Sequence, residues 1–324
     1  MTTSILIRRY SSSDRDDWNN FIEKAKNSTF LFNRDYVDYH RDRFRDHSLL
    51  IYSGNELSAL LIANESGDRI ESHGGLTYGG LILEADVRLE RVLQFFYHAV
   101  KYYHSNGFKT IVYKCVPSYL AIHPSNEDLY AMFLLSANLT RRETSMVLDQ
   151  TKPIGMQRRV NKALKIHESR EYKIVTSRDP LRFWNEVLTP NLGERYGVEP
   201  VHSVAEMKLL MDRFPENIQL FEVYDTQLVA GAVVYVMPHA AHLQYISANT
   251  AGRESEASGV LIHYLIKDVY PDKDYFSFGT SNSEAGRKLN RGLASWKEGF
   301  GARAFIHDFY EIETANYVML AGYE

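Results

Sequence analysis

Several features that define whole protein classes are scarce or missing in this chain of 324 residues. Its single cysteine, Cys115, excludes an internal disulfide framework and any zinc site built on several cysteines. No two histidines have metal-ligand spacing, and we therefore expect no metal. The longest apolar run, Leu228 to Met237, is far shorter than the roughly 20 residues that span a bilayer, so we expect no membrane insertion. The first residues have too short an apolar stretch for a signal peptide, which predicts a cytoplasmic protein.

The chain also lacks a strong excess of charge of one sign. Its formal net charge is −4, which argues against a protein that coats DNA or RNA. An apolar fraction of 44% and a charged fraction of 24% are typical of an ordinary globular protein. At 324 residues the length favours two domains of roughly 150 residues each.

The second half of the chain repeats the pattern of the first. Each half contains a strand pair, a third strand, an amphipathic helix, and two last strands that flank a short helix. These segments lie at 49–64, from 69, 88–104, 109–117 and 139–150, and again at 220–236, from 241, 258–270, 274–281 and 302–312. We therefore predict an α+β protein with domains at 1–150 and 173–324, each a mixed, mostly antiparallel sheet flanked by helices. A cleft between two such domains is a preferred place for a ligand.

The segment 151–172 is expected to be a basic linker helix. Two acidic residues, Glu168 and Glu171, stand against seven basic ones in this part of the chain: Lys152, Arg158, Arg159, Lys162, Lys165, Arg170 and Lys173. A solvated helix surface explains such a run of charge. Alternatively, the segment lines the cleft and attracts the phosphates of a nucleotide or coenzyme.

The segment 72–81, SHGGLTYGGL, is rich in glycine within a region that is otherwise typical of a strand. Four glycines in one strand indicate bulges or a close approach of the backbone to a ligand. His73 and Tyr78 would then project into the cleft. The alternative is a glycine-rich hairpin in which both side chains bind nearby backbone groups.

The order of elements in the two halves resembles the tandem GNAT (Gcn5-related N-acetyltransferase) and FemAB-like acyltransferases, of the type found in bacterial surface-polysaccharide biosynthesis. The resemblance spans nearly the whole chain. The strings that carry it are SHGGLTYGGL (72–81), EDLYAMF (127–133), YGVEPVH (196–202) and NRGLASWKEGFGAR (290–303).

The resemblance implies an N-acyltransferase that uses acetyl-CoA or another acyl-CoA. The acceptor would be the amino group of a sugar, linked to a nucleotide, and the acyl group would pass directly through a tetrahedral intermediate. The second domain would hold the acyl-CoA, and the first would supply most of the acceptor site. Two alternatives stay open: a FemAB-like transferase that takes its acyl group from aminoacyl-tRNA and acts on a peptidoglycan precursor, and a catalytically silent sugar-binding protein.

The same resemblance implies where the coenzyme binds. The backbone at Ile246, Ser247 and Ala248 would line the thioester arm. The diphosphate and adenosine would lie against Arg253, Ser258, Gly259, Asn290 and Lys297. A helix N-terminus near Ser258 suits a diphosphate, because its free N–H groups carry partial positive charge. The chain departs from the family pattern at Glu256, where a glycine is usual.

An attacking amine must first lose a proton, so the reaction requires a base. The candidates are His73, His123, Glu127 and Asp128 in the first half and His202 in the second. Glu127 and Asp128 are equally well explained as acidic residues that complement a helix dipole. Tyr245 or Tyr310 could protonate the departing thiolate, and we assign this role to Tyr245. Acceptor binding is assigned to Tyr78, Lys114, Arg141, Tyr196 and His202.

Overall fold

The computed structural model describes residues 4–167 and 171–324, and its chain forms two compact units. The first unit consists of Met1–Glu143, Glu284–Arg287 and Ile306–Glu324, and the second of Thr144–Ser283 and Lys288–Phe305. These bounds differ from the expected domains 1–150 and 173–324. The reason is that the last strand leaves the second unit and pairs with a strand of the first, Phe309 opposite Lys114 and Glu313 opposite Thr110.

The first unit contains two groups of strands. The order β1-β3-β4-β7 forms one sheet, and β17, β8, β6, β5 and β2 are neighbours in the other. The strands are β1 (Ile5–Arg9), β2 (Arg45–Asp46), β3 (Leu49–Ser53), β4 (Glu56–Leu61), β5 (Asn64–Ser66), β6 (Arg69–Glu71), β7 (Leu81–Leu83), β8 (Thr110–Lys114) and β17 (Arg303–Glu313). The helices are η1 (Ser12–Asp14), α1 (Arg15–Ile22), η2 (Phe30–Phe32), α2 (Arg34–Val37), η3 (Asp38–His40), α3 (Leu89–Ser105), η4 (Ser118–Leu120), α4 (Glu127–Leu134) and η7 (Thr314–Tyr323).

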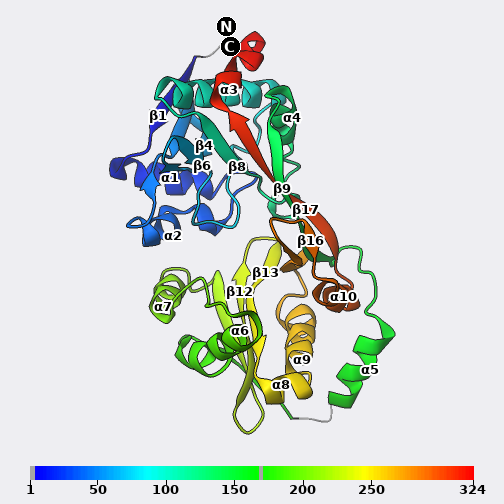
Figure 1. The fold of residues 1–324 in the computed structure, drawn as a ribbon. Coiled ribbons are helices and arrows are strands. Elements are labelled where there is room, and N and C mark those ends of the chain that lie inside the picture. Colours follow the sequence, from blue (N-terminus) through cyan, green and yellow to red (C-terminus); the bar gives the residue numbers. More distant parts are fainter. Residues whose placement is uncertain (1–3, 168–170) are drawn as a thin grey trace. The chain divides into compact units, whose positions relative to one another are not determined.

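Helix α3 provides much of the core of the first unit. Val92, Phe96, Val100 and Tyr103 recur at three and four residues and are all buried, as the sequence pattern predicts. The helix packs against η7 and β1, and Figure 1 shows it lying across the strands. Among the described residues, no helix combines the length and the apolar character that a membrane crossing requires.

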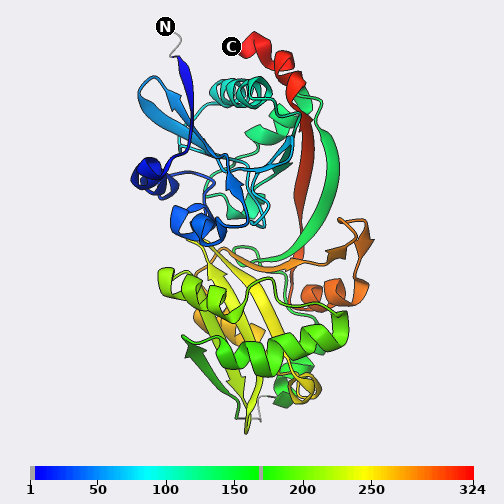
Figure 2. The same ribbon diagram turned by 60° about the vertical axis from the view of Figure 1, so that its left-hand side comes forward.

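The second unit is built on one mixed sheet in the order β10-β11-β12-β13-β14-β9. Its strands are β9 (Asn138–Asp149, which begins in the first unit), β10 (Lys173–Ser177), β11 (Ile218–Tyr224), β12 (Leu228–Val236), β13 (Ala240–Ala248) and β14 (Tyr275–Thr280), with the small pair β15 (Asn282–Ser283) and β16 (Lys288–Leu289) beside them. Its helices are α5 (Arg158–His167), η5 (Phe183–Leu188), α6 (Thr189–Tyr196), α7 (Val204–Arg213), α8 (Thr250–Glu254), α9 (Ala257–Tyr264), η6 (Leu265–Val269) and α10 (Arg291–Gly299). Figure 2 shows α6 and α7 in front of the sheet and α9 behind it.

The expected basic linker 151–172 is only partly a helix, and it belongs to the second unit. Helix α5 packs on α9, where Leu164 is buried and Val160 contacts the core of that unit. Arg158, Lys162 and Lys165 are exposed on its outer side. Of the expected linker, residues 168–170 lie outside the described residues.

Candidate active site

Strands β13 and β14 separate within the second unit and leave a gap in the sheet. They pair in parallel only from Ala240 opposite Tyr275 to His242 opposite Ser277, although β13 continues to Ala248. On its other edge β13 carries a bulge, because Leu243 and Tyr245 face adjacent residues of β12 and Gln244 is the additional residue. A bulge bends its strand and increases the local twist. The bend lies just beyond the last paired residue, where the gap begins.

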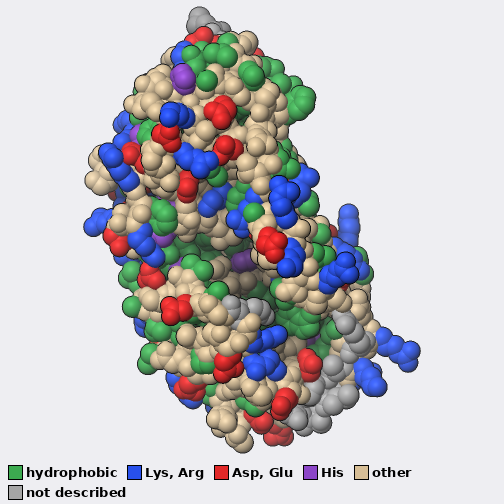
Figure 3. Space-filling model, in the orientation of Figure 1, with side chains coloured by type: hydrophobic (Ala, Val, Ile, Leu, Met, Phe, Trp, Pro, Cys, Tyr) green, Lys and Arg blue, Asp and Glu red, His purple; other side chains and the backbone are tan. Residues whose placement is uncertain are grey.

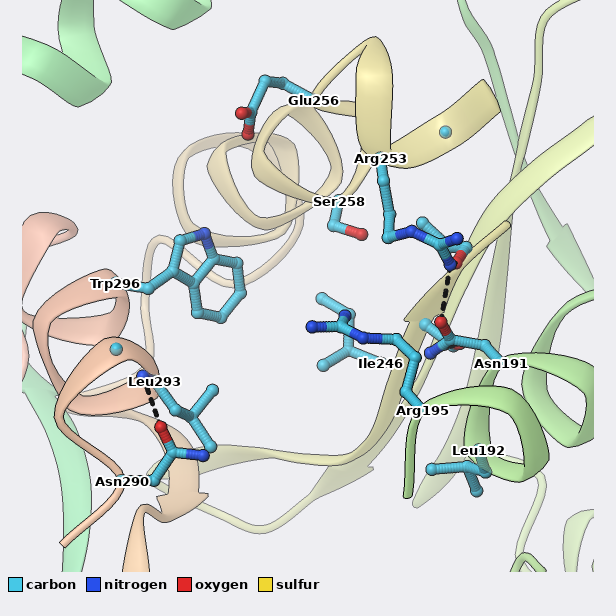
Figure 4. Close-up of a pocket in the computed structure, with 14 residues that line it drawn as sticks. Asn191, Leu192, Arg195, Ile246, Arg253, Glu256, Ser258, Asn290, Leu293 and Trp296 are labelled. Atoms are coloured by element: carbon cyan, nitrogen blue, oxygen red, sulfur yellow. Dashed lines mark hydrogen bonds between the residues drawn. The ribbon is translucent and has the colours of Figure 1, made fainter. Parts of the chain in front are cut away.

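A pocket of about 490 Å³ lies along the unpaired end of β13. Its walls come from α6, β13, the turn between α8 and α9, and the start of α10 (Figure 4). The lining residues are Asn191, Leu192, Arg195, Ile246, Ser247, Ala248, Gly252, Arg253, Glu256, Ser258, Asn290, Gly292, Leu293 and Trp296. The volume falls within the range of pockets that hold small molecules.

The structure brings six of the eight residues predicted for coenzyme binding into this one pocket, namely Ile246, Ser247, Ala248, Arg253, Ser258 and Asn290. The other two are nearby but do not line it. Gly259 is buried in the first turn of α9. Lys297 is buried in α10, and its ammonium donates to the carbonyl oxygens of Gly279 at 3.0 Å and Thr280 at 2.5 Å. Burial lowers the pKa of Lys297 to about 7.

Helix α6 contributes three lining residues that the sequence analysis missed: Asn191, Leu192 and Arg195. Positions i, i+1 and i+4 span about 100° of the circumference of a helix, so a helical interpretation of NLGERY would have placed the three on one side. Figure 4 shows the Arg195 side chain extending from α6 toward the middle of the pocket. Trp296 and Leu293 of α10 form an apolar wall and were also missed.

Hydrogen bonds connect the polar residues at the base of the pocket. Arg253 donates to the side-chain oxygen of Asn191 at 2.6 Å and to the carbonyl of Ala248 at 3.0 Å. The Asn191 amide nitrogen donates to Ser247 Oγ at 3.0 Å. These contacts tie β13, α6 and α8 together on the side of the pocket where cationic groups gather (Figure 4).

Glu256 has an unusual backbone conformation for its residue type. Its φ is 55°, in the left-handed region that glycine adopts without strain. A glycine, the usual residue of the family at this position, would adopt this backbone conformation without strain. This chain has a glutamate in that conformation. The carboxylate is turned away from Arg253 (Figure 4) and lies over the first turn of α9, 3.8 Å from where a Cβ on Gly259 would be.

Half-buried Tyr245, on β13, contacts buried His202, in the loop before α7. The Tyr245 hydroxyl lies 2.8 Å from His202 Nδ1 and accepts the backbone N–H of His202 at 3.2 Å. Trp184 packs edge-on against Tyr245 and donates its indole N–H to the carbonyl of His202 at 2.9 Å. The pair joins a predicted catalytic residue to a predicted acceptor-binding residue.

No protein-family model and no curated protein sequence matches the chain. The chain resembles known proteins in its three-dimensional structure. FemX aligns with a TM-score of 0.68 at 11% identity, over 94% of this chain and 96% of that chain. L-PGS from Bacillus licheniformis gives 0.59 at 12% identity (97% and 95%), and a tandem GNAT protein from the clavulanic acid biosynthesis pathway gives 0.51 at 12% identity (96% and 99%). The chain has the tandem GNAT, FemAB-like fold. The predicted fold class is confirmed.

The two units of this tandem GNAT fold differ at the strand gap. In the first unit β6 pairs in parallel with β8 up to Glu71 opposite Val112, as β13 does with β14. The segment 72–81 then closes the gap. Ser72 donates its N–H to Val112, Gly79 donates to Lys114, and Leu81 donates to the hydroxyl of Tyr113. Of the two units, the second therefore has the open gap between strands.

The glycines of segment 72–81 approach the protein's own atoms. A Cβ on Gly75 would lie 2.1 Å from His40 Nε2, and one on Gly79 would lie 2.0 Å from the carbonyl oxygen of Ser72. This close packing gives the glycines a structural role. The segment is not a hairpin, because β6 and β7 at its two ends belong to different sheets. The ammonium of Lys114 holds the segment in place by donating to the carbonyls of His73 at 2.8 Å and Leu76 at 2.9 Å. Burial lowers the pKa of Lys114 to about 8.

His73 is only 2% exposed, and its ring stacks on His40 with centroids 5.1 Å apart. Its Nδ1 accepts the N–H of Gly75 at 3.2 Å. Burial, and then the nearby His40 and Lys114, lower the pKa of His73 to about 3. Its imidazole is thus neutral at physiological pH. The catalytic role of His73 stays a prediction, and these contacts give it a structural role as well.

Three further base candidates lie in or before the first turn of α4. His123 is exposed in the preceding loop. Glu127 pairs with the buried Lys26 at 2.5 Å. Asp128 accepts a hydrogen bond from Tyr113 Oη at 3.2 Å, and desolvation raises its pKa to about 6. A carboxyl group whose pKa is raised in this way is suited to act as a base near neutral pH.

The remaining acceptor-binding predictions have mixed surroundings. Tyr78 is buried and donates to Thr29 Oγ1 at 3.1 Å. Arg141 is exposed, pairs with Glu143, and lies over the ring of Phe309 at 4.4 Å. Tyr196 ends α6, but its side chain lies outside the described part of the structure.

Proposed function

We propose that the protein is an N-acyltransferase that binds an acyl-CoA, such as acetyl-CoA, in the pocket of its second unit. The observation that carries the proposal is the gap between β13 and β14, which opens beside the pocket lined by Arg253, Ser258 and Asn290. Peptide groups on the unpaired edge of β13 are suited to bind an extended thioester arm. Arg253, Arg195 and the start of α9 are suited to bind its phosphates.

The proposed acceptor is the amino group of a sugar, linked to a nucleotide. Its nitrogen would attack the thioester carbonyl, the C–S bond would break, and an amide would form. One proton leaves the nitrogen for a base, and the thiolate takes up a proton. Asp128 is the proposed base, with Tyr245 as the proposed proton donor to the thiolate. CoA supplies the activated acyl group, and the chain supplies binding, orientation and proton transfer.

A second proposal shares the fold and takes the acyl group from aminoacyl-tRNA, for transfer to a peptidoglycan precursor. Glu256 favours it, because a carboxylate over the first turn of α9 opposes the binding of a diphosphate there. The formal net charge of −4 favours CoA. Figure 3 shows acidic and basic side chains interspersed over the visible face, and an RNA helix requires many phosphate contacts from Lys and Arg.

Thermal unfolding with acetyl-CoA, free CoA and nucleotide-linked amino sugars tests the donor and the acceptor together. A ligand that binds only the native state raises Tm, and 100 times its Kd stabilises by about 2.7 kcal/mol. We expect CoA species to raise Tm, and amino sugars to trigger release of free thiol from acetyl-CoA. Sugars already N-acetylated are the control, because they have no free amine. Stabilisation by sugars without thiol release would instead support a silent sugar-binding protein.

A further inference from the structure

Arg253 is held on one side by acceptors of the protein. Its Nη1 donates to Asn191 Oδ1 and to the carbonyl of Ala248, and its Nη2 donates to Thr250 Oγ1 at 2.9 Å. A guanidinium has five N–H donors in one plane. Among the described residues, two of the five have no assigned acceptor. The Nε and Nη2 donors that remain form the kind of edge that binds a phosphate through two parallel hydrogen bonds.

Asn191 fixes which edge of Arg253 is occupied. It is 9% exposed, and its amide nitrogen donates to Ser247 Oγ while its oxygen accepts from Arg253. This orientation is unambiguous, because a guanidinium can only donate. Asn191 follows the π-helical stretch η5, whose wider turns change the direction of the side chains after it. Such stretches are frequent at functional sites.

We propose that Asn191 is a positioning residue that presents the free edge of Arg253 to a phosphate group of the acyl donor. The inference rests on the proposed function and deepens it, since it assigns the residue that orients the phosphate-binding Arg253. CoA and an RNA donor would both offer Arg253 a phosphate oxyanion. In this proposal the oxyanion is the diphosphate of CoA, and binding of an RNA backbone in its place is one outcome of the test below.

Two near-isosteric substitutions separate positioning from general support of the fold. Asn191→Asp places a carboxylate on Arg253 and neutralises its charge, whereas Asn191→Leu removes the hydrogen bond. Asn217→Asp is the matched control, because Asn217 lies in the same unit, is half-buried, and donates to a carbonyl, that of Val236, at 2.9 Å. Arg253→Gln removes the cation itself.

The measurement is the Kd of each full-length variant for CoA and for pantetheine, which carries the thiol arm and no phosphate. We expect Asn191→Asp to weaken CoA binding about tenfold or more, the effect of one lost charge-assisted contact. Pantetheine binding and the Asn217→Asp control should stay within about twofold of the wild type, the usual scatter for distant sites. Equal weakening of both ligands, or unchanged CoA binding, would overturn the inference.

The double variant Asn191→Asp with Arg253→Gln shows whether Asn191 acts through Arg253. We expect it to bind CoA no more weakly than Arg253→Gln alone, because coupled residues are not additive. Fully additive losses contradict the inference. If Asn191→Asp does not fold, Asn191→Leu takes its place in the same comparison.

A second binding experiment uses a short RNA helix, equivalent to a tRNA acceptor stem, as the ligand. If the wild type binds this RNA and not CoA, the proposed acyl-CoA function fails. The positioning role then stands only if Asn191→Asp weakens RNA binding. A wild type that binds neither ligand overturns both proposals.

Discussion

Glu256 is the residue at which this chain departs most clearly from the family pattern, and it allows a direct test. A non-glycine residue with positive φ stores strain of roughly 1 kcal/mol or more. Its carboxylate over α9 also opposes a bound diphosphate. We predict that Glu256→Gly binds acetyl-CoA about five- to tenfold more tightly, since one near-surface repulsion of about 1 kcal/mol is removed. Titration calorimetry measures the change.

The control is Glu284→Gly, at an exposed glutamate of the first unit with φ 52°. Both substitutions relieve a similar backbone strain, so both should leave Tm unchanged or raise it slightly. Only the substitution in the pocket should change affinity. Unchanged or weaker acetyl-CoA binding by Glu256→Gly would count against a diphosphate at this turn and favour the aminoacyl-tRNA donor.

Asp128 predicts a pH dependence. Desolvation raises its pKa to about 6, and a general base acts only when deprotonated. The rate should therefore increase with pH up to about 6 and then level off. In Asp128→Asn this inflection should disappear together with most of the activity, by about 100-fold or more. Glu127→Gln is the control. A wild-type profile retained in Asp128→Asn would remove Asp128 from the mechanism.

Among the residues, the sequence located those that the resemblance places at a strand or a helix start. Ile246, Ser247 and Ala248 followed from the order of elements, Arg253 and Ser258 from motif positions, and Asn290 from its place before a helix, and all of them line the pocket. Asn191 had no such mark, because its contacts with Ser247 and Arg253 cross more than fifty residues of chain. Local patterns do not contain pairings of that length.

Among the elements, α7 begins at a residue that its local sequence determines, because a capping box lies at its N-terminus. Ser203 and Glu206 have the sequence spacing of a capping box, and the structure contains one: Ser203 accepts the N–H of Glu206, and Glu206 accepts the N–H of Ser203 at 2.8 Å. We predict that Ser203→Ala lowers the free energy of unfolding by about 1 kcal/mol. Urea denaturation measures it. Ser283→Ala, at an exposed serine, is the control and should change little. Equal effects of the two would contradict the capping role.

Other elements depended on contacts that no local pattern shows. Segment 72–81 has the composition of a strand with glycines, yet only Leu81 of it belongs to a strand, because its backbone closes the gap beside β8. The sequence likewise gives no sign of the bulge at Gln244. It arises from the register between β12 and β13, which depends on both strands at once.

For the whole molecule, the repeat of pattern predicted two similar units, and the fold comparison agrees. The bounds could not be predicted, because the chain passes between the units three times after residue 280. Strand β17 begins in the second unit and pairs with β8 of the first. A boundary of this kind is fixed by strand pairing over about two hundred residues, which periodicity does not reveal.

The difference between the units predicts that one acyl-CoA binds to each chain, in the second unit, because segment 72–81 closes the gap of the first unit. Calorimetric titration of the full chain with acetyl-CoA measures this stoichiometry. We expect one acetyl-CoA per chain and no binding to Ser258→Trp, in which the indole fills the pocket of the second unit. No binding, a stoichiometry of two, or full binding by Ser258→Trp would contradict this expectation.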